Sequence, residues 1–83
     1  MKYAINQLVY SIASRGGQLE IQEMHIDKIA LYRKDGQIAY SGITTSDPES
    51  IYYSLEENQL FPSYEEAINE IQRQLSVLRA KHD

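Results

Sequence analysis

The last quarter of the chain carries apolar residues at the spacing of one helix face. They recur at alternating intervals of four and three, and they are Tyr64, Ile68, Ile71, Leu75 and Leu78. Just before them, Ser63 is followed three residues later by Glu66. This is the Ser-x-x-Glu capping box, in which the two side chains satisfy free backbone N–H groups of the first turn. The pattern predicts an amphipathic helix over residues 63–81.

The charges along this helix follow its dipole. Glu65, Glu66 and Glu70 come early, and Arg73, Arg79 and Lys81 come late. Negative charge near a helix N-terminus and positive charge near its C-terminus are both favourable. Glu70 and Arg73 are also three residues apart, so they are expected to pair on the helix surface.

The apolar stripe of the helix has two possible partners. It can pack on the chain's own sheet, as the stripe of an amphipathic surface helix usually does. Part of it can instead pair with a second copy of the chain, because the same spacing is that of a coiled-coil seam. The candidate oligomer seam consists of Tyr64, Ile68, Ile71, Leu75 and Leu78.

Upstream of the helix, apolar and polar residues alternate with the period of a β-strand. The clearest turn is Asp35-Gly36, a dipeptide typical of two-residue hairpin loops in which both central residues need positive φ. The expected pairs across it are Arg33 with Ile38, Leu31 with Tyr40, and Ile29 with Gly42. In this register Ile29, Leu31, Ile38 and Tyr40 share one face, as a half-buried sheet requires.

Further strands are expected on both sides of this hairpin. Residues 18–24 alternate as a strand, and residues 24–27 are expected to bend it toward the next one. Residues 44–50 form a polar loop. Residues 51–55 are rich in strand-forming side chains, and residues 56–59 are expected to turn into the helix.

Residues 1–14 fit two patterns. Ala4, Ile5, Leu8, Val9, Ile12 and Ala13 repeat with a helical period. The same segment is rich in β-branched and aromatic residues, which favour strand, with Asn6-Gln7 as a tight turn. The residues by themselves leave both structures open.

The chain of 83 residues has the length of one domain, residues 1–83. We expect a sheet region over 1–61 followed by the helix over 63–81. The chain has no cysteine, which excludes disulfides and thiolate metal sites. The N-terminal residues show no signal-peptide pattern and no run approaches about 18 apolar residues, so we expect a cytoplasmic protein with no membrane span.

The net charge of −4 is unevenly distributed. Between Asp35 and Gln72 the chain has eight acidic residues and no Lys or Arg. A surface of one sign either keeps a small protein soluble or faces a basic partner. The candidate partner-binding residues are Asp47, Glu49, Glu56, Glu57, Glu65, Glu66 and Glu70.

Motifs for catalysis or metal binding are not evident. A nucleophile needs a base and an orienting group, and the chain offers no cysteine and only His25 and His82 as histidines. His25 and Asp27 would supply two ligands from one strand face, fewer than a metal site needs. We therefore expect a non-enzymatic protein without metal or cofactor.

Two ligand classes remain as alternatives to a protein partner. The Gly16-Gly17 turn can present backbone N–H groups, and Arg15 a positive charge, to the phosphate of a nucleotide. Tyr32 and Tyr40 would complete such a site in an oligomer, because one small chain has little room for a deep pocket. Nucleic-acid binding through the sheet tyrosines is the other alternative, and the net acidity disfavours it.

The order of short motifs is similar to that of a known group of proteins. The motifs are Tyr-Ala-Ile-x-x-x-Val-Tyr at 3–10, Ile-x-x-Ile at 26–29, Gln-Ile-Ala-Tyr at 37–40, and Tyr53-x-x-Glu56 through Leu60-Phe61 to Ser63-x-x-Glu66-Ala67. They resemble short, largely uncharacterised proteins of bacteriophages and their Firmicute hosts. The resemblance implies an α+β fold, in which a small, bent, SH3-like antiparallel sheet of four to five strands is closed by one C-terminal helix. It favours strand over helix for residues 1–14, and it brings no catalytic residues.

The expected function follows from the acidic surface and this resemblance. We expect a non-enzymatic interaction protein, encoded by a phage or mobile element, that binds and inhibits a host protein such as a defence factor. The alternatives are an oligomeric nucleotide-sequestering protein and a nucleic-acid-binding module.

Overall fold

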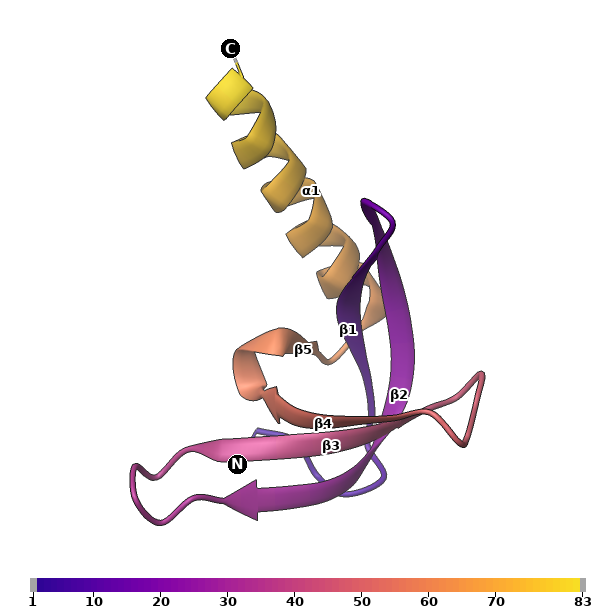
Figure 1. Cartoon of the computed structure of the whole chain (residues 1–83), viewed down its shortest axis with the longest axis vertical. Coiled ribbons are helices and arrows are strands. Elements are labelled where there is room, and N and C mark those ends of the chain that lie inside the picture. The colour runs from indigo at the N-terminus through magenta and orange to yellow at the C-terminus, as the bar shows by residue number, and fades with distance from the viewer. Residues whose placement is uncertain (1, 83) are drawn as a thin grey trace.

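The computed structural model describes residues 2–82, with side chains up to Val77. Its elements are β1 (Leu8–Arg15), β2 (Gln18–Leu31), β3 (Ile38–Thr44), β4 (Ile51–Glu56), the 3-10 helix η1 (Glu57–Gln59), β5 (Leu60–Phe61) and α1 (Tyr64–His82). Figure 1 shows a curved sheet from which α1 rises at one side. The expected α+β fold, an antiparallel sheet followed by a C-terminal helix, is confirmed, and the described strands number five.

The sheet is an antiparallel meander that ends with a return to its first strand. The strand order is β4-β3-β2-β1-β5. The long strand β2 pairs with β1 through its first half and with β3 through its second. A register shift between Ile26 and Lys28 lies in the second half of β2. Such a bulge bends a strand and increases its twist, which agrees with the bend expected at residues 24–27.

The predicted register of the β2–β3 hairpin is wrong by two residues. The observed pairs are Leu31 with Ile38, Ala30 with Ala39, and Ile29 with Tyr40. Successive side chains of a strand alternate between the two faces, so a shift of two residues keeps every side chain on its predicted face. The large apolar residues of the hairpin therefore still share one side of the sheet.

The reason for the shift lies in the loop between these strands. Only Gly36, with φ of 71°, has positive φ there, whereas the predicted two-residue loop needs it at Asp35 as well. Asp35 instead accepts a 3.1 Å hydrogen bond from Gln37 N through Oδ1. The backbone N–H of Tyr32 closes the wider loop on the carbonyl of Gln37 at 2.9 Å.

The helical interpretation of residues 1–14 is wrong. Gln7 N donates to Ala4 O at 3.1 Å in a turn that holds Asn6 at φ of 68°, and β1 starts at Leu8. Asparagine tolerates this left-handed conformation better than most residues. The backbones of Asn6 and Ile26 are joined at 2.7 Å, so the turn is pinned to β2. The strand interpretation is confirmed for residues 8–15.

Two short elements between β4 and α1 were not predicted. Residues 57–59 form η1, and Leu60 and Phe61 form β5, which pairs with Ser11 and Tyr10 of β1. This two-residue strand returns the chain to the far edge of the sheet. It also buries Leu60 in the core.

The core lies on one face of the curved sheet. Its buried residues are Tyr3, Val9, Met24, Ile26, Tyr40 and Leu60. Gly42 of β3 makes room for one of them, because a Cβ at this position would overlap the Met24 side chain. The absence of a side chain at Gly42 is therefore part of the packing.

Of the predicted capping box at the start of α1, the structure shows the Ser63 half. Ser63 Oγ accepts a 3.2 Å hydrogen bond from Glu66 N, and the Glu66 carboxylate contacts the same hydroxyl at 3.3 Å. The predicted pair of Glu70 and Arg73 is also present. Both features are local to the helix. The cap satisfies a backbone N–H group of the first turn, and the ion pair joins two side chains on the helix surface.

The first turns of α1 pack on the sheet. Ala67 is fully buried and Ile68 and Ile71 are half-buried, whereas Tyr64 and Leu75 are 55% and 43% exposed. Figure 1 shows the rest of the helix rising beyond the sheet, beside the β1–β2 hairpin. The radius of gyration, 14.1 Å, exceeds the roughly 12 Å expected of a compact domain of this length. The side chain of Leu78, the last residue of the candidate seam, lies outside the described part of the chain.

Candidate functional site

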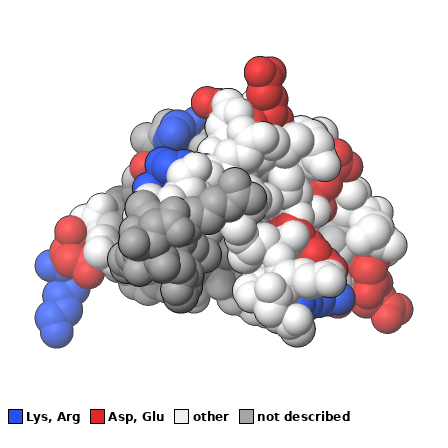
Figure 2. Space-filling view, turned by 90° about the horizontal axis from the view of Figure 1, so that it is seen from above, with Lys and Arg blue, Asp and Glu red and all other residues white. Residues whose placement is uncertain are grey.

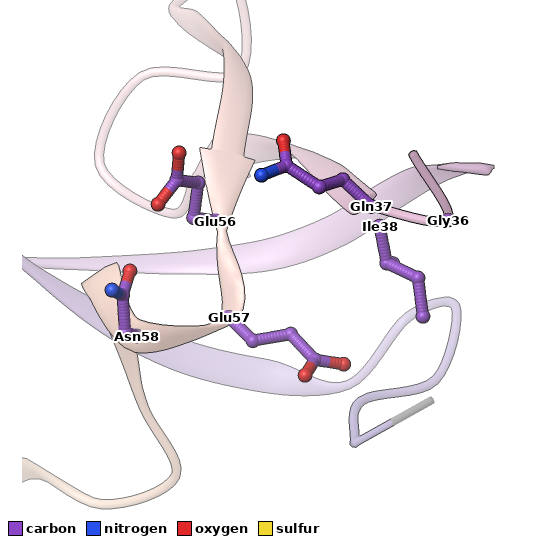
Figure 3. Close-up of a pocket in the computed structure, with 6 residues that line it drawn as sticks. All are labelled: Gly36, Gln37, Ile38, Glu56, Glu57 and Asn58. Atoms are coloured by element: carbon purple, nitrogen blue, oxygen red, sulfur yellow. The ribbon is translucent and has the colours of Figure 1, made fainter. Parts of the chain in front are cut away.

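The candidate site is a hollow at one end of the β3–β4 pair. It has a volume of about 360 Å³, within the range of ligand pockets. Its lining residues are Gly36, Gln37, Ile38, Glu56, Glu57 and Asn58, shown in Figure 3. The pairing of Ala39 with Glu56 explains the arrangement, because it sets the residues before β3 beside those after β4.

The change from strand to 3-10 helix separates the two acidic side chains of this hollow. Glu56 ends β4 and Glu57 begins η1. In Figure 3 the two side chains point away from each other, Glu57 on the side of Ile38. Gln59 holds the turn by accepting a 2.8 Å hydrogen bond from Glu56 N through Oε1. Glu56 is exposed and Glu57 is half-buried.

The carboxylate of Glu57 is held by two donors. Tyr40 Oη donates at 2.7 Å and the backbone N–H of Lys2 at 3.0 Å, both to Oε1. The hydrogen bond from Tyr40, followed by that from Lys2 N, lowers the pKa of Glu57 below its usual value. Donors of this kind favour the charged form of a carboxyl group. Glu57 is therefore a fixed negative charge at neutral pH.

The donor Tyr40 lies inside the core. Its ring is fully buried and meets the Tyr3 ring edge-to-face at 5.6 Å between centroids. Burial, and then the hydrogen bond to Glu57, raise the pKa of Tyr40. Tyr3 closes the network, because its N–H donates to Tyr40 Oη at 3.3 Å and its hydroxyl to Leu60 O at 3.0 Å. The network ties the N-terminal segment, β3 and η1 together beneath the hollow.

A bound group can meet two carboxylates in this hollow. Both described hydrogen bonds to Glu57 end on Oε1, which leaves Oε2 for an incoming donor. Glu56 offers a second carboxylate, and Gln37 and Asn58 offer side-chain amides. Among the described residues that line the hollow, none is basic. This lining, with two carboxylates and two amide oxygens as acceptors, suits a positively charged group.

The structure gathers only part of the predicted acidic surface. Glu56 and Glu57 both line the hollow, with their side chains pointing apart, whereas Asp47 and Glu49 lie in the loop at the opposite end of β4. A six-residue strand spans roughly 20 Å. The remaining candidates, Glu65, Glu66 and Glu70, lie on α1, where Glu66 contacts the cap and Glu70 pairs with Arg73. Figure 2 shows the acidic side chains as several separate patches rather than one face.

The predicted nucleotide-binding residues are not brought together within one chain. Arg15, Gly16 and Gly17 lie at the exposed tip of the β1–β2 hairpin, and Tyr32 follows the other end of β2. A strand of 14 residues extends up to about 45 Å. Tyr40, in the core, is not accessible to a ligand.

Sequence reasoning missed four of the lining residues, Gly36, Gln37, Ile38 and Asn58. The signal that could have located Gln37 and Ile38 was the Asp35-Gly36 turn, because a hairpin turn determines which residues begin the next strand. The pairing of β3 with β4, which sets residues 37–38 near residues 56–58, has no local signature in the sequence.

Two further observations bear on the site. Among the side chains that the structure describes, which extend to Val77, no three His, Asp or Glu form a group that could hold a metal ion. Within residues 2–82, the range that the structure describes, no helix has the length and apolar character needed to cross a membrane.

The chain was also compared with known proteins. No protein-family model, curated protein or solved structure matches it. Its function is therefore argued from the geometry of the hollow.

Proposed function

We propose that this chain is a non-enzymatic interaction protein whose acidic hollow receives a Lys or Arg side chain of a protein partner. One observation carries the proposal. The Glu57 carboxylate is fixed by two hydrogen bonds next to a second carboxylate, Glu56, in a hollow whose described lining contains no basic residue.

The chemistry of the hollow favours a cationic side chain over other ligands. A carboxylate already held in place loses little freedom when a donor arrives, so more of the interaction energy appears as affinity. Arginine can donate an N–H group to Glu57 Oε2, and lysine offers a point charge. The amides of Gln37 and Asn58 can receive the remaining N–H groups through their carbonyl oxygens.

The buried position of Tyr40 supports binding rather than catalysis. Its hydroxyl is engaged with Glu57 and Tyr3 inside the core, so it serves to position a carboxylate. A general acid or base must reach a substrate proton, and this group is enclosed by its own chain.

The biological setting belongs to the same proposal. Origin in a phage or mobile element, action in the host cytoplasm and inhibition of a host protein such as a defence factor come from the resemblance of the sequence motifs. An SH3-like description of the sheet is part of it as well. The small curved meander, in which β5 returns to pair with β1, supports that description.

A nuclear magnetic resonance titration with N-acetyl-arginine amide tests the hollow directly. We expect shifts confined to the amides of residues 37–38 and 56–58, weakened at about 0.5 M salt because exposed charges are screened. Glu57→Gln should reduce these shifts, and the matched control Glu49→Gln, in the distant β3–β4 loop, should not. Equal shifts around Glu49 and Glu57, or no shifts at all, would refute the proposal.

A further inference from the structure

A second hollow lies at the open end of the core. It has a volume of about 410 Å³ and is lined by Ile5, Ile29, Leu31 and Ile38. Ile29 and Ile38 pack against the buried core, whereas Ile5 and Leu31 are 50% and 66% exposed. Large apolar side chains around a concave surface are typical of a binding site rather than of a solvated one.

This apolar hollow adjoins the acidic one. Ile38, the first residue of β3, lines both. In Figure 3 its side chain projects to the same side as that of Glu57. The fixed carboxylate of Glu57 and the apolar hollow therefore lie next to each other, with Ile38 between them.

We propose that the two hollows form one composite site, which binds an extended partner segment carrying a Lys or Arg two residues from a large apolar residue. This inference rests on the proposed function, because it takes the acidic hollow as the place of the basic side chain. Charge complementarity assigns the basic residue to Glu56 and Glu57. The apolar neighbour then covers Ile5 and Leu31, the two most exposed residues of the apolar hollow.

The dimensions agree with a short segment of chain. Neighbouring residues of an extended peptide are about 3.3 Å apart along the strand, and alternate ones point to the same side. A basic residue and an apolar residue two positions away can therefore reach adjacent hollows without a further element of structure. Affinity is expected to come chiefly from the apolar contact, because an exposed ion pair contributes little.

Fluorescence anisotropy with three labelled peptides tests the composite site. The probes are Gly-Leu-Ser-Arg-Ser-Leu-Gly, the same peptide with both leucines replaced by serine, and the same peptide with arginine replaced by glutamine. We expect the first to bind about tenfold more tightly than the serine peptide, and about twofold to fivefold more tightly than the glutamine peptide, the range of an exposed ion pair. Leu31→Ser should abolish the preference for leucine, and the control Tyr53→Ser, at an exposed β4 residue that lines neither hollow, should retain it.

The outcomes separate the two proposals. Equal binding of the leucine and serine peptides, both weakened by Glu57→Gln, would overturn the composite site and leave the proposed function standing. Equal binding of the arginine and glutamine peptides would overturn both. Self-association of the protein that Leu31→Ser or Ile5→Ser removes would show that a second copy covers the apolar hollow, and would also overturn the composite site. Circular dichroism of each variant verifies that it is folded.

Discussion

The hydroxyl of Tyr40, inside the core, donates a 2.7 Å hydrogen bond to Oε1 of Glu57, on the wall of the acidic hollow. The two residues lie 17 positions apart, in β3 and η1. Because Tyr40 also packs against Tyr3, the position of the carboxylate depends on the packing of the core. Changes in this network should therefore affect both stability and the site.

Tyr40→Phe should lower the free energy of unfolding by about 1–2 kcal/mol, the usual cost of removing one buried hydrogen-bonding group. The ring remains, so the apolar packing is retained, while Glu57 Oε1 and Tyr3 N lose a partner. Urea denaturation measures the change. Tyr53→Phe is the matched control, because Tyr53 is 67% exposed, and an equal loss there would contradict the role given to the Tyr40 hydroxyl.

Stability should depend on pH at both ends of the scale. The folded-state pKa of Glu57 is lowered, so its contribution is present above the unfolded pKa, near 4.3, and is lost as pH falls through the folded value. The pKa of Tyr40 is raised, so its contribution is present below the unfolded pKa, near 10, and is lost as pH rises through the folded value.

Thermal unfolding between acid and alkaline pH compares the variants. Glu57→Gln should flatten the acid limb relative to the unmodified protein, and Tyr40→Phe should flatten the alkaline limb. Glu65→Gln, on the exposed surface of α1, is the control for the acid limb. If stability falls at acid pH in the same way in Glu57→Gln and Glu65→Gln, the hydrogen bonds to Glu57 do not cause the loss of stability at acid pH.

Gly42→Ala should destabilise the protein by about 1–3 kcal/mol, the usual cost of overpacking a core. The added Cβ overlaps the sulfur of Met24, which is fully buried and must move. A double-mutant cycle with Met24→Ala isolates the cause, because the methyl group should cost less when the longer side chain is absent. If the two substitutions have additive effects on stability, the strain does not come from the contact with Met24. Ser41→Ala, on the same strand, is the control and is expected to change the stability little.

Ser63→Ala should cost about 1 kcal/mol by removing the cap of α1. The hydroxyl accepts from Glu66 N, so its loss leaves a backbone donor of the first turn without its partner. Far-ultraviolet circular dichroism should show reduced helix content, because the sheet supports only the first turns. Ser76→Ala, at an exposed position within the helix, should leave or raise the helix content; a loss there equal to that of Ser63→Ala would argue against a specific cap.

The features that the sequence predicted correctly depend on neighbours along the chain. The cap that Ser63 Oγ provides for Glu66 N and the pair of Glu70 and Arg73 each join residues three apart, so each is set by helix geometry alone. The faces of the β2–β3 hairpin were also predictable, because alternation survives a register shift of two residues. The shift itself was not predictable, since Asp35 can serve a two-residue loop or, as observed, a wider one.

The sequence by itself therefore determined the α+β class, the capped helix and the alternation of the hairpin strands, because short-range propensity and periodicity carry that information. Only the tertiary structure decided that Glu57 meets Tyr40, that Ile38 separates an acidic from an apolar hollow, and that the stripe of α1 is partly exposed at Leu75. These relationships come from the pairing of β3 with β4 and the return of β5 to β1. Such pairings are decided by packing across the whole fold, which no local pattern of residues records.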